Sequence, residues 1–206
     1  MAAALRFAFE GETIMRTLLL GTLVLALATP VAAGDIHGKV ACKGTRDCAG
    51  AVVYVDAIPG KTFPVPTAHE KVNQLNLVFD PHVVPVLVGT TVDFLNSDSV
   101  QHNVFSPDAC AEKFNLGTWP KGEMRSYTFK KDCVATLLCK VHAEMEAFVV
   151  AVPTPYYSVT KADGSFRIAD VPDGAYTVKV WHPKLKATSK PVTVAGATEA
   201  AFEIAR

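Results

Sequence analysis

Short runs rich in β-branched and aromatic residues recur along the chain, and no stretch has the periodicity of a long amphipathic helix. Glycine, proline and aspartate separate the runs at typical turn sequences, such as 120–122, 163–164 and 172–174. Many short strands at regular spacing favour sandwiches or barrels, so the sequence predicts an all-β fold. The expected strands are 51–57, 83–88, 91–95, 126–129, 135–138, 147–152, 165–168, 175–181, 192–194 and 200–204.

The N-terminal residues have the pattern of a secretory signal peptide. Arg16 precedes an apolar run at 17–27 that is too short to cross a bilayer, and Val31 and Ala33 occupy the positions that a signal peptidase recognises. Residues 1–33 are therefore the predicted signal, with 1–14 as an extension if translation starts at Met15 instead of Met1. The mature protein is expected to be periplasmic or secreted, without membrane insertion after cleavage.

Exported proteins tend to oxidise their spare thiols, and an odd number of cysteines, here five, leaves at least one without a disulfide. Cys42 and Cys48 bracket a polar turn and are expected to bond to each other. Cys110 could then pair with Cys133 and leave Cys139 for a metal; alternatively, Cys133 pairs with Cys139 and Cys110 stays free. Strand positions six residues apart lie ~20 Å apart, far beyond the ~5.5 Å Cα separation of a disulfide, which favours Cys110–Cys133.

A cluster of potential metal ligands occupies one short segment. Cys139, His142 and Met145 follow one another at i, i+3 and i+6, and His102 lies far upstream. Thiolate sulfur favours Cu(I) and imidazole nitrogen favours Cu(II); two imidazoles, a thiolate and a weak axial thioether form the ligand set of electron-transfer copper sites. The sequence therefore predicts one copper ion bound by these four residues. Strand alternation predicts that Cys139 shares a face with Leu137.

The stretch Val72–Val152 resembles the cupredoxins, the small blue-copper proteins of the plastocyanin and amicyanin type. The Cys-x2-His-x2-Met loop is most similar to that of amicyanin. The other segments that carry the resemblance are Phe79-Asp80-Pro81, 86–96 and His102-Asn103-Val104.

The resemblance implies a Greek-key β-sandwich with His102, Cys139 and His142 as equatorial ligands and Met145 as the axial one. It also implies that Asn103 ties the His102 loop by hydrogen bonds to the loop before Cys139. The chain departs from the family at Leu138, where an aromatic residue is usual. It also departs at Glu144 and Glu146, which bring negative charge to a normally apolar edge and so bear on partner choice. The remaining histidines of the mature chain are interpreted as structural or surface residues: His37, His69, His82 and His182.

A second module follows the proline-rich segment at 153–155. Residues 160–180 alternate cleanly, with Tyr176, Val178 and Val180 on one face, and resemble the carboxypeptidase regulatory-like, or transthyretin-like, β-sandwich domains. The predicted domains are 34–60, a linker at 61–71, the cupredoxin domain at 72–152 and the second sandwich at 153–206. Either the cupredoxin domain is inserted into a sandwich to which 34–60 contributes, or 34–60 adds strands to the cupredoxin domain.

Net charge and motifs narrow the function classes. The formal net charge is zero and long charged runs are missing from the sequence, which argues against nucleic acid as a partner. Neither a Ser-His-Asp set nor a paired-carboxylate motif is present, so we do not expect an enzyme. The favoured function is one-electron transfer between a redox donor and an acceptor protein. The alternatives are a copper-binding or chaperone protein without electron transfer, and a metal-free interaction module.

Overall fold

The computed structural model describes residues 32–206. The predicted signal peptide, apart from Ala32 and Ala33, and the choice between Met1 and Met15 lie outside the described residues. Within 32–206, no helix has the length and apolar character needed to cross a membrane. The described chain is all-β, as predicted, with strands in four sheets.

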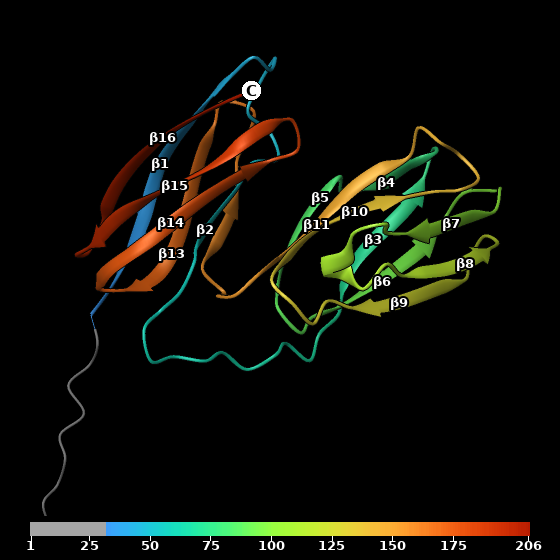
Figure 1. Cartoon of the computed structure of the whole chain (residues 1–206), viewed down its shortest axis with the longest axis horizontal. Helices are drawn as coiled ribbons and strands as arrows, with labels where there is room; N and C mark the ends of the chain where they lie inside the picture. The colour runs from blue at the N-terminus through green and yellow to red at the C-terminus, as the bar shows by residue number, and fades with distance from the viewer. Residues whose placement is uncertain (1–31) are drawn as a thin grey trace, which may run out of the picture. The chain divides into compact units, whose positions relative to one another are not determined.

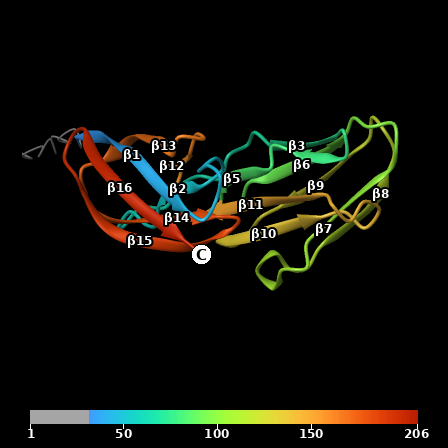
Figure 2. The same cartoon turned by 90° about the horizontal axis from the view of Figure 1, so that it is seen from above.

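Two of these sheets form the sandwich that carries the predicted ligands. One has the strand order β5-β11-β10-β7-β8 and the other has the order β4-β3-β6-β9; Figure 2 shows β3, β6 and β9 on one side and β10, β11 and β7 on the other. The strand bounds are β3 Glu70–Leu75, β4 Val78–Asp80, β5 Val83–Leu87, β6 Thr91–Asn96, β7 His102–Phe105, β8 Asn115–Trp119, β9 Met124–Thr128, β10 Cys133–Leu138 and β11 Glu146–Val152.

The core of this sandwich follows from residue alternation. Along β10, buried residues alternate with partly exposed ones, and Leu137 is fully buried on the face that Cys139 continues. From the opposite sheet, Val72 and Phe94 are fully buried in the same cluster. The shared face predicted for Leu137 and Cys139 is therefore confirmed.

The other two sheets form a second sandwich, with the strand orders β13-β1-β16 and β12-β2-β14-β15. Figure 1 shows β1, β13, β14, β15 and β16 of this sandwich, with the C-terminus beside the end of β1. The strand bounds are β1 Ala33–Lys43, β2 Val52–Val55, β12 Tyr157–Val159, β13 Ser165–Pro172, β14 Gly174–His182, β15 Leu185–Val194 and β16 Thr198–Ala205.

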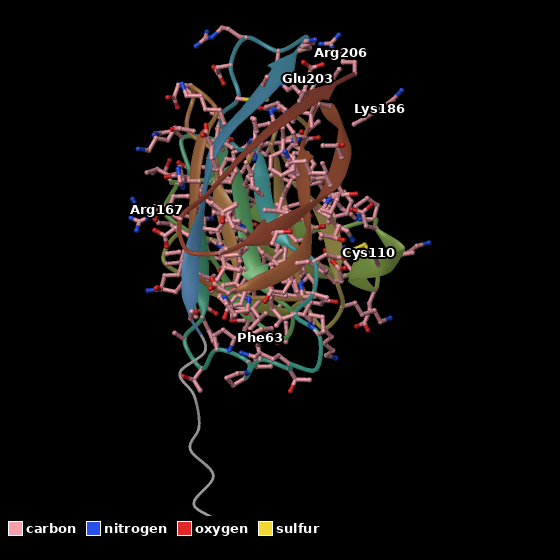
Figure 3. All side chains as sticks on the ribbon, turned by 90° about the vertical axis from the view of Figure 1, so that its left-hand side faces the viewer. Phe63, Cys110, Arg167, Lys186, Glu203 and Arg206 are labelled. Atoms are coloured by element: carbon pink, nitrogen blue, oxygen red, sulfur yellow. A yellow bond between two sulfur atoms is a disulfide. The ribbon has the colours of Figure 1, made fainter. Side chains whose placement is uncertain are left out.

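Strands from both ends of the chain make this second sandwich. β1 pairs antiparallel with β13 and parallel with β16, and β2 pairs with β12 and β14. The parallel pair is so close at Gly38 that an added Cβ would lie 1.9 Å from the carbonyl oxygen of Ala200. At the far end of the pair, Lys43 Nζ lies 2.8 Å from Glu203, which Figure 3 shows near the C-terminal Arg206. These pairings are the ones expected if the ligand-bearing sandwich is inserted between β2 and β12.

All five cysteines lie in the described part of the chain. Cys42 is bonded to Cys48 and Cys110 to Cys133, while Cys139 is buried and has a free thiol. Figure 3 labels Cys110 and shows its sulfur on the loop that contains the short 3-10 turn η1, Ala109–Ala111. This is the pairing that strand spacing favoured, and it leaves one thiol next to the predicted histidine ligands.

Candidate metal centre

The ligands predicted from the sequence come from two neighbouring strands and the loop between β10 and β11. Cys139 directly follows β10, and His142 and Met145 lie in the loop that leads to β11. His102 is the first residue of β7, which pairs with β10 through Leu138 and Phe105. The sheet therefore brings the remote histidine to the end of β10.

His102, Cys139 and His142 come together as one cluster. One ligand atom of each, two imidazole nitrogens and the Cys139 sulfur, lie within 4.8 Å of one another. The Nδ1 atoms of His102 and His142 are 3.1 Å apart, so both rings turn the same atom toward a common centre. His102 is fully buried and Cys139 is almost so, whereas His142 is partly exposed. The cluster is thus a closed site with one edge, at His142, open to solvent.

Met145 lies at the base of the same loop. Its side chain is 1% exposed and belongs to the core cluster that also contains Cys139. Its backbone N–H donates to the carbonyl oxygen of His142 at 3.2 Å, which closes the loop into a tight turn. The Met145 thioether is therefore buried in the same core cluster as Cys139. Axial ligation by Met145 stays a prediction.

Asn103 joins the parts of the site through hydrogen bonds. Its backbone N–H donates to Cys139 Sγ at 3.4 Å, and its side-chain oxygen accepts from Lys140 N at 3.2 Å. Its amide nitrogen donates to Asn115 Oδ1 at 2.8 Å and to the Gly117 oxygen at 2.6 Å, both on β8. Asn103 thus ties the His102 strand by hydrogen bonds to Cys139 itself and to Lys140, the residue after it, rather than to a loop before Cys139. Lys140 lies beyond the last β10–β11 pair, Leu138 with Glu146, so its N–H is not part of that ladder.

Sequence reasoning missed one residue of the site, Asp98. Its Oδ2 lies 2.8 Å from His102 Nε2, on the side of the ring that faces away from His142. Burial of Asp98 raises its pKa, but hydrogen bonds from Leu77 N, His102 and Asn76 N outweigh burial, so the pKa of Asp98 is lower than usual. A spacing of four residues indicates side-chain proximity only on a helix, and Asp98 and His102 lie in a turn and at the start of a strand, so no sequence signal indicated this pair.

The loop that contains His142 also carries apolar and acidic side chains. Val141, next to His142, is 49% exposed, and Glu144 and Glu146 flank Met145 in the loop. A groove of about 550 Å3 borders this loop, with lining residues that include Leu75, Val78, Phe79, Asp80, Glu144, Met145 and Glu146. His82 and Lys184 also line this groove, so its surface is apolar with both acidic and basic side chains.

The donor set fits copper better than other common protein metals. A soft thiolate with two imidazoles suits Cu(I) and Cu(II), whereas magnesium and calcium prefer oxygen ligands and structural zinc usually takes four ligands. Among residues 32–206, this is the one cluster of three or more His, Cys, Asp or Glu side chains with metal-binding geometry. The geometry is consistent with a type 1 copper site.

The other histidines take no part in this cluster. His37 and His82 are exposed, and His69 Nδ1 bonds to Asp93 at 2.9 Å. His182 is buried and accepts a hydrogen bond from Lys184 N, and its pKa is lowered, chiefly by burial and further by Lys184.

Comparison with known proteins gives a family match over part of the chain. Residues 143–201 match the family model described as domain II of polysaccharide lyase family 4, a fibronectin type III-like module. The match begins in the ligand loop and continues through β11 to β16. None of the curated proteins gives a significant match.

Several solved structures are similar to the chain. A reduced mutant of amicyanin has 22% identity and a TM-score of 0.40, with 42% of this chain and 85% of that chain covered. A purple cupredoxin from Nitrosopumilus maritimus has 24% identity and a TM-score of 0.37, with 40% of this chain and 98% of that chain covered. A copper-containing nitrite reductase from Thermus scotoductus SA-01 has 24% identity and a TM-score of 0.41, with 48% and 25% covered.

The second module is thus similar in part to a fibronectin type III-like family, whereas the sequence pattern had suggested the carboxypeptidase regulatory-like domains; both are β-sandwiches. The chain is an all-β protein in which the sandwich that bears the His-Cys-His cluster is combined with a second β-sandwich, and part of the chain is similar in fold to cupredoxin structures.

Proposed function

We propose that the protein is an exported type 1 copper protein that carries single electrons between a donor and an acceptor protein. The observation that carries the proposal is the convergence of His102, Cys139 and His142 within 4.8 Å in a buried site. In the proposed site these three side chains hold one copper ion, with Met145 as a weak fourth ligand. Copper supplies the Cu(I)/Cu(II) couple when it is bound.

The chain's own residues support a carrier rather than an open metal-exchange site. Buried hydrogen bonds of Asn103 hold both the Cys139 segment and β8, so the ligands are preorganised. The exposed edge is confined to His142, next to exposed Val141, which gives a partner one short path to the site. We place partner docking at this edge, and Glu144 and Glu146 favour a partner with basic residues around an apolar centre.

Export is supported by the two disulfides in the described chain, because such bonds persist in oxidising compartments. We place the mature protein in the periplasm or outside the cell. A carrier also needs no catalytic group, and we propose no enzymatic activity for it.

Addition of Cu(II) to the purified mature protein tests the proposal. We expect an intense visible thiolate-to-copper band and a type 1 spin-resonance spectrum. Cys139→Ser should lose the band with an unchanged circular dichroism spectrum, while His37→Asn, at an exposed imidazole on β1, should keep it. If wild-type protein gives no such band, the type 1 copper site is excluded, and a protein that holds only Cu(I) or a metal-free interaction module becomes the better hypothesis.

A second measurement separates a carrier from a copper chaperone. A carrier should show a reversible reduction potential, fast self-exchange of electrons and slow loss of copper to a chelator. A chaperone should instead release copper readily, because its site must open to pass the ion on. Rapid chelator extraction without reversible voltammetry would contradict the carrier function.

A further inference from the structure

The fully buried His102 ring makes a polar contact at each of its two nitrogens. Nδ1 faces His142 at 3.1 Å, and Nε2 meets the Asp98 carboxylate at 2.8 Å. We propose that Asp98 is a positioning residue that locks His102 in the tautomer with Nδ1 free to bind metal, and that its negative charge lowers the reduction potential of the site. The second half of this proposal rests on the proposed copper function.

The carboxylate of Asp98 is itself held in place. Asn76 N donates to Oδ1 at 2.7 Å and Leu77 N donates to Oδ2 at 3.0 Å. Both donors lie in the left-handed region, with φ of 58° at Asn76 and 61° at Leu77, which is uncommon for leucine. This backbone conformation of the β3–β4 turn presents two successive N–H groups to one carboxylate. The turn therefore fixes the position of Asp98 against the ring of His102.

The opposite end of Asp98 is anchored as well. Its backbone N–H donates to Asn96 Oδ1 at 2.9 Å. The Asn96 amide nitrogen in turn donates to the carbonyl oxygens of Val100 at 2.9 Å and Trp119 at 3.0 Å. Asp98 thus lies in a network that connects β6, the β3–β4 turn and the start of β7, and its side chain is only 12% exposed. The carboxylate cannot swing to solvent without breaking several of these bonds.

The contact dictates which nitrogen of His102 carries the proton. An ionised carboxylate only accepts hydrogen bonds, so Nε2 must be the N–H donor, and Nδ1 of the neutral ring keeps its lone pair. In the metal-free protein His142 Nδ1–H can then donate to His102 Nδ1 across the 3.1 Å contact. The lone pair of His102 already points into the cluster, so no tautomer change is needed for metal binding.

A carboxylate behind a metal-binding imidazole also acts on the metal. Such a partner raises the basicity of the ligand, and a nearby negative charge favours the more positive oxidation state. Both effects stabilise Cu(II) relative to Cu(I), so both lower the reduction potential. The size of both effects on the reduction potential depends on the charge of the side chain and not on its shape. The substitution Asp98→Asn is therefore informative, because it removes the charge and nearly keeps the shape.

The chain offers a matched control on β6, the strand that precedes Asp98. Asp93 on β6 is also a buried carboxylate that contacts a histidine, His69 Nδ1 at 2.9 Å, and accepts a hydrogen bond from Ser126 Oγ. His69 is 46% exposed at its side chain and is not part of the metal cluster. Asp93→Asn and Asp93→Ala therefore report the general cost of removing a carboxylate that contacts a histidine in this sandwich.

The first test uses the metal-free protein and long-range 1H–15N spectra of the histidine rings. In wild type we expect His102 as a single tautomer protonated at Nε2. Asp98→Ala should give exchange between both tautomers, whereas Asp98→Asn, which keeps an acceptor oxygen, and Asp93→Ala should keep the single form. A His102 ring that stays in the Nε2–H form in folded Asp98→Ala protein, or that is protonated at Nδ1 in wild type, would overturn the positioning role. If Asp98→Ala does not fold, the protonation site in wild type decides this role alone.

The second test measures the reduction potential of the copper-loaded protein. We expect Asp98→Asn to shift the relative affinity toward Cu(I) by about tenfold, a rise of about 59 mV for a one-electron couple. Asp93→Asn should leave the potential unchanged. An Asp98→Asn potential equal to that of wild type would overturn the charge effect while the copper site stands. If wild-type protein binds no copper, the proposed function and the charge effect fail together, and the metal-free spectra still decide the role of Asp98 in orienting the ring.

Discussion

At the scale of single residues, the site depends on side chains that bond to several partners at once. Asn103 is 2% exposed, and its side chain serves Lys140, Asn115 and Gly117. A buried polar group that loses its partner costs about 1–3 kcal/mol, whereas a typical hydrogen bond contributes about 1 kcal/mol net. The removal of Asn103 therefore costs more than its size suggests, because it leaves partners on β8 and in the loop after β10 unpaired.

We predict that Asn103→Ala lowers the free energy of unfolding of the metal-free protein by about 2–3 kcal/mol. Denaturant unfolding followed by fluorescence measures this change. The matched control is Gln101→Ala, at an exposed position two residues earlier, which should stay within about 0.5 kcal/mol of wild type. Equal effects of the two substitutions would show that the Asn103 network does not stabilise the fold.

A second residue-scale prediction concerns acid. Hydrogen bonds from the hydroxyl and backbone N–H of Ser165, with help from Lys39, lower the pKa of Asp163 to about 2. Because the pKa is lowered by folding, Asp163 contributes stability above its ordinary pKa of 3.8, and this contribution is lost as the pH falls toward 2.

Carboxyl carbon NMR should therefore give a titration midpoint for Asp163 near 2, and Ser165→Ala should move the midpoint up toward 3.8. In stability measurements, the difference between wild type and Asp163→Asn should shrink between pH 4 and pH 2. A difference that grows in this range would contradict the sign of the shift.

At the scale of elements, the β-rich runs of the sequence predicted many of the strands but missed short or polar ones such as β3, β7 and β8. In β3, Glu70–Leu75, only Val72 and the polar Gln74 are buried, so the strand has no apolar face in its sequence. Strands β7 and β8 are also short and contain several polar residues. On β7, the polar His102 and Asn103 are buried because they belong to the candidate site. Whether these segments form strands is determined by pairing with segments that are far away in the sequence.

The residues of the candidate site also differ in whether local sequence could predict them. The loop with Cys139, His142 and Met145 is local, so its spacing in sequence already suggested its chemistry. Asp98 was missed because it lies in the polar run 96–99, which is typical of a solvent-exposed turn. Its role depends on N–H donors from Asn76 and Leu77, more than twenty residues earlier and in an unusual backbone conformation. Local sequence patterns do not carry that information.

The two disulfides allow an element-scale prediction. Cys110–Cys133 closes a loop with a sequence separation of 23, and Cys42–Cys48 one with a separation of 6. The loss of loop-closure entropy in the unfolded chain grows with loop length, to about 3 kcal/mol for the longer loop and about 2 kcal/mol for the shorter.

We therefore expect the double substitution Cys110→Ser/Cys133→Ser to destabilise the metal-free protein more than Cys42→Ser/Cys48→Ser. Urea unfolding of the two double variants and wild type measures the order. The reverse order would mean that residual structure in the unfolded state, rather than loop length, controls the contribution of these bonds.

At the scale of the whole molecule, one sandwich interrupts the other in the chain. The chain leaves the second sandwich after β2, builds the sandwich with the His-Cys-His cluster from β3 to β11, and returns at β12. Hydrogen bonds of β1 with β13 and β16, and of β2 with β12 and β14, join segments that are separated by the entire inserted sandwich. The noncovalent ladder, rather than chain continuity, must therefore hold the N-terminal strands in place.

Cleavage of the connection between β2 and β3 tests this organisation. A site for a specific protease inserted after Gly60, an exposed position where an added side chain would meet nothing within 4 Å, should be cut in the native state. The Cys42–Cys48 bond lies wholly within the N-terminal fragment, so no covalent bond joins the fragments after the cut.

We expect the two fragments to co-elute in gel filtration and to separate only in denaturant, because both N-terminal strands keep their neighbours on two sides. Copper uptake by the cut protein should match that of the intact protein, since all proposed ligands lie in the larger fragment.

The substitution Gly38→Ala in the same cleavable protein tests the pairing of β1 with β16 directly, because the added Cβ would meet the Ala200 oxygen of the parallel partner strand. This variant should release the N-terminal fragment at lower denaturant concentration. If the fragments of the cleaved protein that retains Gly38 separate without denaturant, β1 and β2 contribute little to the stability of the second sandwich.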